Sequence, residues 1–406
     1  MKTPSTCKRS LSLIAALFLF VLQVFASGCS EPEKMLKVES EADTVDTAEL
    51  ETSIQQIMDD YIAVNLQVAV VKGDDIIYTH SFGYKDLEAQ IPLSDTDIFR
   101  IASISKSFAA TAIMQLIEAG DLSLDDDVSD LMGFQIRNPN FPDTPITLKM
   151  LLTHTSSISD AAGYRSLDVI NPEENANWAD SYNDYAPGTD YEYANLNYNT
   201  VGAIIEQVTG QRFDLYIKEH IMDPLGLYGG HCPDLLNADL FAQIYRDDPE
   251  TGEHIKSLSS YKLLGDKLDT YRIGYDAPML SPTGNMKISA TDLAKYMIMH
   301  KNLGIYNGVR IISEQSAQQM QTPQTEIRTD SYYGFALGIY DNFAPIPGKQ
   351  IIGHAGSMYG MRSGMYFNHE DDFGIILIAS GAERDYLNLN GFRGKVINAL
   401  YEHFNL

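Results

Sequence analysis

The sequence has few cysteines and few basic residues. Cys7, Cys29 and Cys232 are the only cysteines among 406 residues, and three thiols cannot build a disulfide scaffold. The 29 Lys and Arg residues are outnumbered by 55 Asp and Glu residues, which gives a formal net charge of −26. A field of this sign repels the phosphate backbone of nucleic acids. We therefore expect no nucleic-acid partner.

The composition indicates a globular protein. Hydrophobic residues make up 44% of the chain and charged residues only 21%, which leaves enough apolar surface for a sizeable core. No fixed-period repeat and no low-complexity tract follows residue 48. These features exclude a disordered chain and a coiled coil.

The first residues have the layout of an export signal. Basic residues precede an apolar run over residues 11–25, and small residues then lead to Cys29. A transmembrane anchor is the alternative, but a run of this length is short for a bilayer core that needs about 20 residues. We predict a signal over residues 1–28, followed by an acidic tether over residues 29–47.

The end of this segment, Ala26-Ser27-Gly28-Cys29, resembles a bacterial lipoprotein signal. The resemblance implies that Cys29 is lipidated and becomes the mature N-terminus. The protein would then be anchored to a membrane of the bacterial cell envelope, facing the periplasm or the cell surface.

Both ends of the remaining chain, residues 48–406, combine helix with strand. Apolar side chains over residues 50–61 share one helical face, and residues 66–71 and 76–82 predict a hairpin. Three strand-like runs and a final helix follow near the C-terminus, over residues 350–353, 360–367, 373–379 and 396–404.

These elements predict an α+β fold. We expect residues 48–105 and 290–406 to form one antiparallel sheet of about five strands flanked by helices. Residues 106–289 would form a large, mainly helical insertion, in which 111–116 and 201–208 are the clearest helices. A cleft between two such parts is a common ligand site.

Ser103 and Lys106 form the first candidate for catalysis. They open a helical pattern, and residues three apart on a helix lie on the same face. A serine hydroxyl is a weak nucleophile unless a base takes its proton, and a buried lysine can serve because burial disfavours its charged form. Ser259 and Lys262 have the same spacing, but they lie in an apparent loop.

Two further patterns could complete a site. Tyr193 could shuttle a proton and Asn195 could orient a substrate, although Tyr-x-Asn also occurs at residues 340–342, 366–368 and 386–388. His354 precedes Ala355 and Gly356 at the end of a predicted strand. The small residues would let the backbone approach a ligand and would leave the N–H of Ser357 free to donate.

The joint occurrence of these segments in order resembles the serine β-lactamase and penicillin-binding superfamily. The segments are residues 99–106 (FRIASISK), 151–157 (LLTHTSS), 187–188 with 193–195 (PG, YAN) and 353–356 (GHAG). The pattern is most similar to the class C branch, which includes D,D-peptidases, D-aminopeptidases and esterases. The resemblance covers about residues 50–404 and implies a β-lactamase/transpeptidase-like fold.

The resemblance also implies roles for individual residues. Ser103 would be the acylated nucleophile, Lys106 its proton acceptor or electrostatic partner, and Tyr193 the general base and acid. Asn195 would hold the substrate amide. The backbone N–H groups of Ser103 and Ser357 would form an oxyanion hole. No cofactor and no metal is needed for this chemistry.

Two positions depart from the family pattern. His354 replaces a lysine that is common in true β-lactamases of this branch, so we expect carboxylate recognition there to be weaker or dependent on pH, and β-lactam turnover to be inefficient. Ser157 stands where the family's loop commonly has glycine, and a non-glycine residue strains any positive φ.

We therefore expect an exported serine hydrolase, monomeric, that acts on small peptides of D-amino acids, other small peptides or esters, or β-lactams. The alternative is a non-catalytic sensor of penicillin or cell-wall peptides with the same pocket. The role of Trp178 and the nearby Tyr182 and Tyr185, in a cleft wall or in a loop core, stays open.

Overall fold

The computed structural model describes residues 46–248, 251–383 and 387–406. The predicted export signal, Cys29, all but the end of the tether, and Tyr386 lie outside the described residues. Within the described ranges, no helix has both the length and the apolar character to cross a bilayer. Residues Thr47–Leu406 form one unit.

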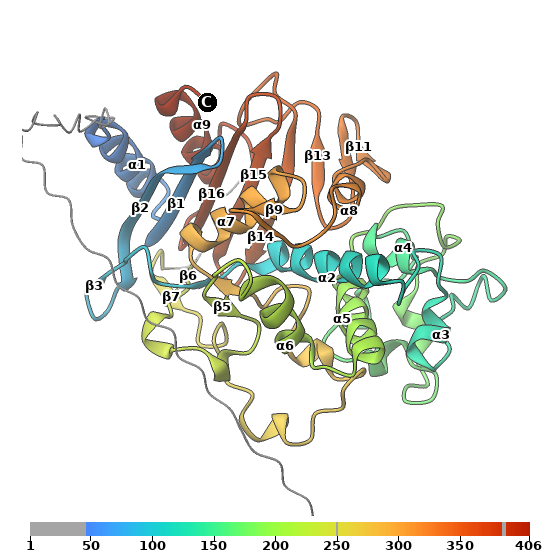
Figure 1. The fold of residues 1–406 in the computed structure, drawn as a ribbon. Coiled ribbons are helices and arrows are strands. Elements are labelled where there is room, and N and C mark those ends of the chain that lie inside the picture. The colour runs from blue at the N-terminus through green and yellow to red at the C-terminus, as the bar shows by residue number, and fades with distance from the viewer. Residues whose placement is uncertain (1–45, 249–250, 384–386) are drawn as a thin grey trace, which may run out of the picture. The chain divides into compact units, whose positions relative to one another are not determined.

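A nine-stranded sheet runs through the described part of this unit (Figure 1). Every neighbouring pair is antiparallel, in the order β11-β12-β13-β14-β15-β16-β1-β2-β3. The strands are β1 (Asn65–Lys72), β2 (Asp75–Asp86), β3 (Ile91–Pro92), β11 (Thr325–Arg328), β12 (Ser331–Tyr333), β13 (Gly338–Tyr340), β14 (Ile351–Met358), β15 (Met361–Asn368) and β16 (Phe373–Ser380).

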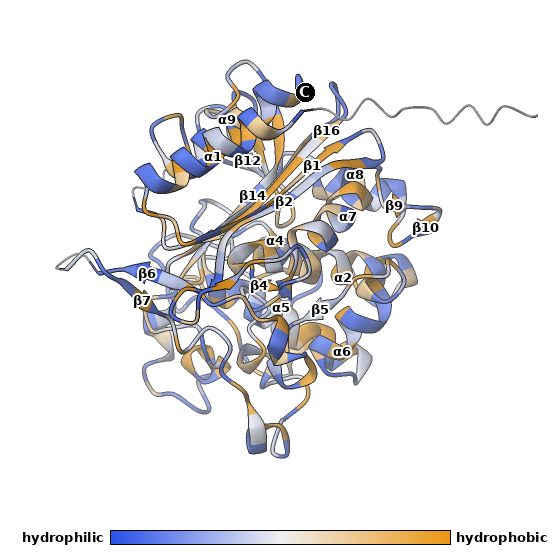
Figure 2. Ribbon diagram, turned by 90° about the vertical axis from the view of Figure 1, so that its left-hand side faces the viewer, coloured by the Kyte–Doolittle hydropathy of each residue, from blue (hydrophilic) through white to orange (hydrophobic). Residues whose placement is uncertain are grey.

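The centre of the sheet is buried on both faces. Every residue of β16 is buried, which is why this strand reads as a continuous apolar run rather than an alternating one. Its odd-numbered residues, such as Leu377, pack toward helices α1 (Ala48–Asp60) and α9 (Phe392–Phe404). Its even-numbered residues, such as Ile376, face α7 (Ala290–Lys301) and the main core. The sheet therefore lies between two helical layers (Figure 2).

The second part of the unit is mainly helical. Its helices are α2 (Ser105–Ala119), α3 (Val128–Met132), α4 (Leu148–Leu152), α5 (Asn195–Thr209) and α6 (Phe213–Ile217), and α8 (Glu314–Met320) follows later in the chain. Short strands complete it in three small sheets: β4 (Phe99–Arg100), β5 (Gly229–Gly230), β6 (Tyr245–Asp247), β7 (His254–Lys256), β8 (Lys287–Ile288), β9 (Ile305–Tyr306) and β10 (Val309–Arg310).

The α+β fold and its terminal elements are confirmed, with two corrections. The five long strands β1, β2, β14, β15 and β16 are those predicted, but four short strands extend the sheet to nine. The predicted strand over residues 350–353 is too short, because β14 continues to Met358. Gly353 and Gly356 interrupt the apolar pattern, yet both lie in the strand where other atoms leave no room for a side chain.

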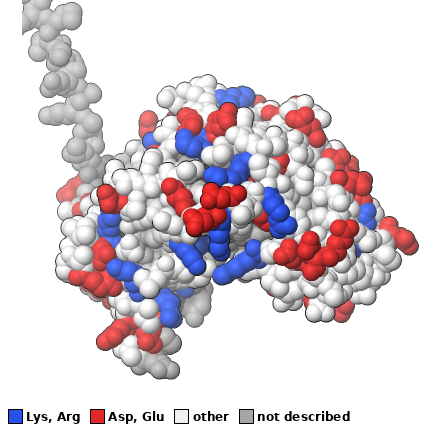
Figure 3. Space-filling model, turned by 90° about the horizontal axis from the view of Figure 1, so that it is seen from below, with Lys and Arg blue, Asp and Glu red and all other residues white. Residues whose placement is uncertain are grey.

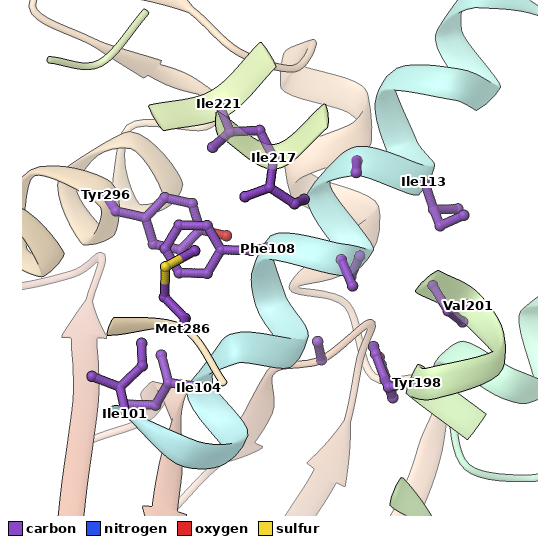
Figure 4. Close-up of a cluster of buried hydrophobic side chains, with 14 of the residues drawn as sticks. Ile101, Ile104, Phe108, Ile113, Tyr198, Val201, Ile217, Ile221, Met286 and Tyr296 are labelled. Atoms are coloured by element: carbon purple, nitrogen blue, oxygen red, sulfur yellow. The ribbon is translucent and has the colours of Figure 1, made fainter. Parts of the chain in front are cut away.

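Helix α2 is buried on nearly all sides and fixes the residues before it. Figure 4 shows apolar side chains around it from several elements: Phe108 on the helix itself, Ile217 and Ile221 on one side, and Val201 of α5 on the other. The Phe108 ring stacks on that of Tyr296 of α7, with 3.8 Å between the ring centroids. This helix therefore joins the helical part to the sheet.

We expect Phe108→Ala to lower the free energy of unfolding by about 3–5 kcal/mol, because it removes a fully buried ring and leaves a cavity. Leu258→Ala is the control, since this side chain is 87% exposed and its loss should change stability by less than about 0.5 kcal/mol. Denaturant unfolding followed by circular dichroism measures both. Equal effects of the two substitutions would contradict this account of the core.

Candidate active site

Ser103 lies at the sharp turn that leads into α2. It belongs to a short 3-10 helix, Ala102–Ile104, directly before Ser105 begins α2. Ala102 has a φ of 46°, a left-handed conformation that is uncommon for a non-glycine residue. The preceding Ile101 is held on both sides, since its N–H donates to Met286 O at 2.9 Å and its carbonyl accepts from Ser363 Oγ at 2.9 Å. The strained turn leaves Ser103 partly exposed.

Lys106 is fully buried beside Ser103. Its Nζ donates to Asn195 Oδ1 and to the Thr283 carbonyl, both at 2.9 Å, and lies 3.3 Å from Ser103 Oγ. Burial lowers the pKa of this amine well below its usual value, and the negative charge of Asp160 only partly opposes that shift. The sequence prediction that Lys106 reaches the Ser103 hydroxyl is thus matched by the geometry.

Asn195 is locked at both ends of its side-chain amide. Its Oδ1 accepts from Lys106 Nζ and from Thr283 Oγ1 at 2.8 Å, while its Nδ2 donates to Asp160 Oδ2 at 2.8 Å. The Asp160 carboxylate also accepts the backbone N–H groups of Asn195 and Leu196, both at 2.9 Å, and so caps the start of α5. One hydrogen of Nδ2 remains for a substrate carbonyl.

Tyr193 lies over Lys106, with Nζ 4.7 Å from the ring centroid. Its buried hydroxyl has no hydrogen-bond partner among the described residues. Burial raises the pKa of Tyr193 above its usual value, and the nearby Ser103 hydroxyl partly opposes the shift. The free site therefore favours a neutral phenol beside a lysine whose neutral form is also favoured.

His154 positions the segment that carries Tyr193. Its carbonyl accepts the N–H of Glu192 at 2.9 Å, and its Nδ1 accepts the N–H of Ala194 at 3.2 Å. Its ring lies against that of Tyr193, with 4.3 Å between the centroids. The residue itself has a φ of 58°. These contacts agree with a structural role for His154.

His354 is on β14, on the other side of Tyr193, with 6.2 Å between the ring centroids. Its Nδ1 lies 2.6 Å from the carbonyl of Ala355, which requires a donor, so Nε2 accepts the hydroxyl of Tyr333 at 3.2 Å. Burial is the main reason that the pKa of His354 falls to about 3. The expected titration near neutral pH is therefore wrong, because the buried ring is already neutral there.

Gly356 and Ser357 follow on the same strand. A Cβ at Gly356 would lie 2.2 Å from Ser363 Oγ and 2.4 Å from the carbonyl of Ile101, so only glycine lets β14 approach the turn before Ser103. β13 pairs with β14 only up to Gly353. The later part of β14 has no strand on that side, which leaves its outward backbone N–H groups available near Ser103.

The remaining predicted positions lie elsewhere. Ser157 has a φ of 64°, the strained conformation expected where the family has glycine, and its Oγ accepts from Asn138 Nδ2 at 2.9 Å. Ser259 and Lys262 line a different cavity, away from Tyr193 and His354. Of the sequence candidates, the structure thus brings together Ser103, Lys106, Tyr193, Asn195, His354 and the backbone of residues 356–357.

Three residues of this site were not predicted: Asp160, Thr283 and Tyr333. Each acts through a predicted residue, since Asp160 and Thr283 hold Asn195 and Tyr333 holds His354. None belongs to a motif, and single Asp, Thr and Tyr residues in loops or short strands carry no sequence signal of their own. Only the folded arrangement identifies them.

The chain belongs to the β-lactamase family, whose family model matches residues 50–395. Among curated relatives, it is 25% identical over 377 residues to protein flp of Staphylococcus aureus (strain N315), covering 86% of this chain and 66% of the relative. It is 29% identical over 286 residues to PbpX of Bacillus subtilis (strain 168), covering 70% of this chain and 65% of the relative. The chain thus spans slightly less than two thirds of these relatives.

Solved structures agree on the fold. A penicillin-binding protein homologue from Pyrococcus abyssi, described as octameric, superposes with a TM-score of 0.67 at 29% identity, over 83% of this chain and 74% of that one. A D-amino acid amidase from Ochrobactrum anthropi SV3 gives 0.67 at 20% identity, over 88% and 99%. The hydrolase EstCE1 gives 0.70 at 20% identity, over 87% and 97%.

We expect Asp160→Asn to weaken the site through Asn195. The neutral side chain loses one strong acceptor at the start of α5, so stability should fall by about 1–2 kcal/mol. Reaction of Ser103 with a fluorophosphonate should slow by about 10–100-fold, because Asn195 and Lys106 lose their fixed positions. Gel fluorescence over time measures the rate.

Ser289→Ala is the matched control. Ser289 caps α7, where its Oγ accepts the N–H of Asp292 at 3.1 Å, so its loss should cost about 1 kcal/mol of stability without slowing the labelling. If the Asp160 variant were labelled at the wild-type rate, the positioning role of Asp160 would be refuted.

Proposed function

We propose that this chain is an exported serine hydrolase that cleaves amide or ester bonds through an acyl-enzyme on Ser103. The observation that carries the proposal is the buried Lys106 amine, 3.3 Å from a partly exposed serine hydroxyl. A serine needs such a base to become a nucleophile. Export and lipidation of Cys29 are proposals that rest on the N-terminal sequence alone.

The reaction would proceed in two halves. Neutral Lys106 accepts the proton of Ser103 as Oγ bonds to the substrate carbonyl carbon. When the tetrahedral intermediate collapses, the bond to the leaving amine or alcohol breaks and the proton passes to that group. The Tyr193 phenol, whose ring centroid is 4.7 Å from Lys106 Nζ, can relay that proton. Water then attacks the ester by the reverse proton path and releases the acid.

Charge on the carbonyl oxygen would be stabilised by the backbone N–H groups of Ser103 and Ser357. Such preorganised donors act strongly in a site from which water is excluded. The path of β14 past Ile101 and the absence of a side chain at Gly356 support this role, because they bring the strand backbone close to the Ser103 turn.

The family and the similar proteins support an acyl-transfer substrate of modest size. By their own descriptions, one similar protein is a D-amino acid amidase and EstCE1 is a hydrolase with promiscuous acyltransferase activity. We propose short D-amino-acid peptides or amides and small esters as the substrate classes. β-Lactams would be poor substrates or inhibitors, because His354 supplies no cation for their carboxylate.

Ser103→Ala should abolish labelling by fluorescent penicillin and by a fluorophosphonate, a loss of about a thousandfold or more, because it removes the oxygen that forms the covalent bond. Ser259→Ala removes the other serine of a Ser-x-x-Lys pair and should still be labelled covalently, at Ser103. Ser289→Ala, which removes a cap of α7, is the matched control and should label normally. Mass spectrometry of the labelled peptide identifies the modified residue. Equal labelling of the Ser103 variant would eliminate this function. Labelling of Ser103 without product from any ester, D-amino-acid amide or cephalosporin would indicate the sensor.

The labelling rate should rise with pH and level off well below the usual lysine pKa of 10.5. Burial lowers the pKa of Lys106, and only the deprotonated amine accepts a proton, so the rate increases as pH passes upward through that lowered pKa. His354 should contribute no inflection near pH 6.5, because its ring is already neutral there. A stopped-flow or time-course pH profile measures this.

Lys106→Arg gives the control for the profile, since guanidinium stays protonated throughout. Its rate should be lower by orders of magnitude and should not rise over the same range. A wild-type rate that keeps rising up to the usual lysine pKa would show that Lys106 is not the proton acceptor.

A further inference from the structure

A cavity of about 280 Å³ lies beside the candidate active site and is lined by four cationic side chains. These are Arg100, Arg165, Lys262 and Lys267, and no acidic residue lines the cavity. On the face seen in Figure 3, several Lys and Arg side chains lie around a hollow near the middle, with Asp and Glu side chains beside them and toward the edge of the view. Such a concentration of positive charge is unexpected in a chain with a net charge of −26.

The cationic groups have no charged partner in the described part of the chain. None of the four forms an ion pair there. Arg100 is only 8% exposed, and its one side-chain hydrogen bond runs from Nε to the carbonyl of Gly284, at 2.7 Å. A buried guanidinium without a carboxylate is costly, and an anion in the cavity would offset that cost.

Tyr359 holds two of the cations in place. The guanidinium of Arg100 lies over its ring, 5.3 Å from the centroid, and Arg165 Nη2 donates to its hydroxyl at 3.0 Å. Tyr359 and Gly360 form the turn between β14 and β15, with φ of 57° and 93°, the conformation of a tight hairpin. The hairpin turn therefore positions the arginines, which are not simply spread over the surface.

The cavity is built from the same segments as the active site. Arg100 is three residues before Ser103, Met358 follows Ser357 on β14, and Asn199 is one helical turn beyond Asn195 on α5. Four residues of α-helix rise about 6 Å. A substrate bound at Ser103 can therefore extend into the cavity.

The cavity lies at the C-terminal end of β14, beyond His354 in the middle of the strand. Met358 is four residues past His354, about 13 Å along the strand. His354 is buried and its Nε2 is occupied by Tyr333, so the position that carries a cation in related enzymes holds a neutral ring here. The cationic side chains that could recognise a negative charge lie instead around the cavity beyond Met358.

We infer that this cavity binds a carboxylate or phosphate group carried by the substrate, on the Ser357 side of Ser103. The inference rests on the proposed hydrolase function and names its substrate class: acyl compounds with an anionic end. Arg100 and Arg165 would contact the anion directly, and Lys262 and Lys267 would attract it from the exposed rim.

Chain-matched esters test the inference. The p-nitrophenyl monoesters of succinate, glutarate, adipate and suberate carry a free carboxylate, and neutral p-nitrophenyl esters of the same chain lengths do not. We expect kcat/KM to favour the anionic ester at one or more lengths. Arg165→Gln and Lys262→Gln, both at exposed positions, should each lower that ratio about tenfold.

Lys218→Gln is the matched control, because Lys218 is exposed and lies outside the cavity; it should leave the ratio unchanged. Thermal melting verifies that each variant is folded. No preference for anionic esters in the wild type, or a preference that survives in the Arg165/Lys262 double variant, would overturn the inference.

Binding to the Ser103→Ala variant separates this inference from the hydrolase function. Calorimetric titration with adipate and with inorganic phosphate should detect binding that the added Arg165→Gln and Lys262→Gln substitutions remove. If the Ser103→Ala variant bound these anions but the wild type hydrolysed none of the esters, the proposed function would be refuted and the anion site would be retained. Absence of binding by both anions would refute the site. Adipate could also change the rate of hydrolysis of a neutral ester without competing with that ester. The cavity would then bind a separate effector, and the substrate assignment would be wrong.

Discussion

The burial of the Lys106 amine is the constraint on which the site depends. An ammonium group removed from water costs several kcal/mol unless it is paired, and the nearest carboxylate, Asp160, reaches it only through Asn195. The neutral form of the amine is therefore favoured over the ammonium form, and the neutral form is the one that can accept a proton from Ser103. The same low-polarity surroundings hold the phenol of Tyr193 and the imidazole of His354 in their neutral forms.

The rest of the fold maintains that burial. Helix α2 is buried along most of its length, so Lys106 cannot reach solvent by local movement of a side chain. The sheet contributes β14, which passes close to Ile101 because Gly356 has no side chain. The helical part contributes α5, whose first residue is Asn195. Elements far apart in the chain thus meet around one hydroxyl, and the strained φ of Ala102 persists because both neighbouring parts hold it.

The sequence predicted the parts of this arrangement that repeat a local pattern. The hairpin of β1 and β2, the strands β15 and β16 and the terminal helices follow from alternation and helical spacing. The extension of β14 did not follow, because its glycines reflect contacts with Met365 and Ile101 that are distant in sequence. Helical spacing predicted that Lys106 reaches Ser103, but Ser259 and Lys262 have the same spacing, so only the ordered motifs of the family resemblance distinguished the two pairs. Asp160, Thr283 and Tyr333 could not, since they act through tertiary hydrogen bonds alone.

The charge distribution separates the chemistry from recognition. Around Ser103 the groups that could be charged are buried and favoured in neutral forms, which suits proton transfer but supplies no field for an anion. The fixed cations gather instead beyond Met358, where the hairpin turn orients two arginines and no carboxylate neutralises them. Because guanidinium keeps its proton at any physiological pH, recognition there does not vary while Lys106 titrates. The inferred anion site would thus let an acidic protein, whose net charge repels anions, admit one beside Ser103.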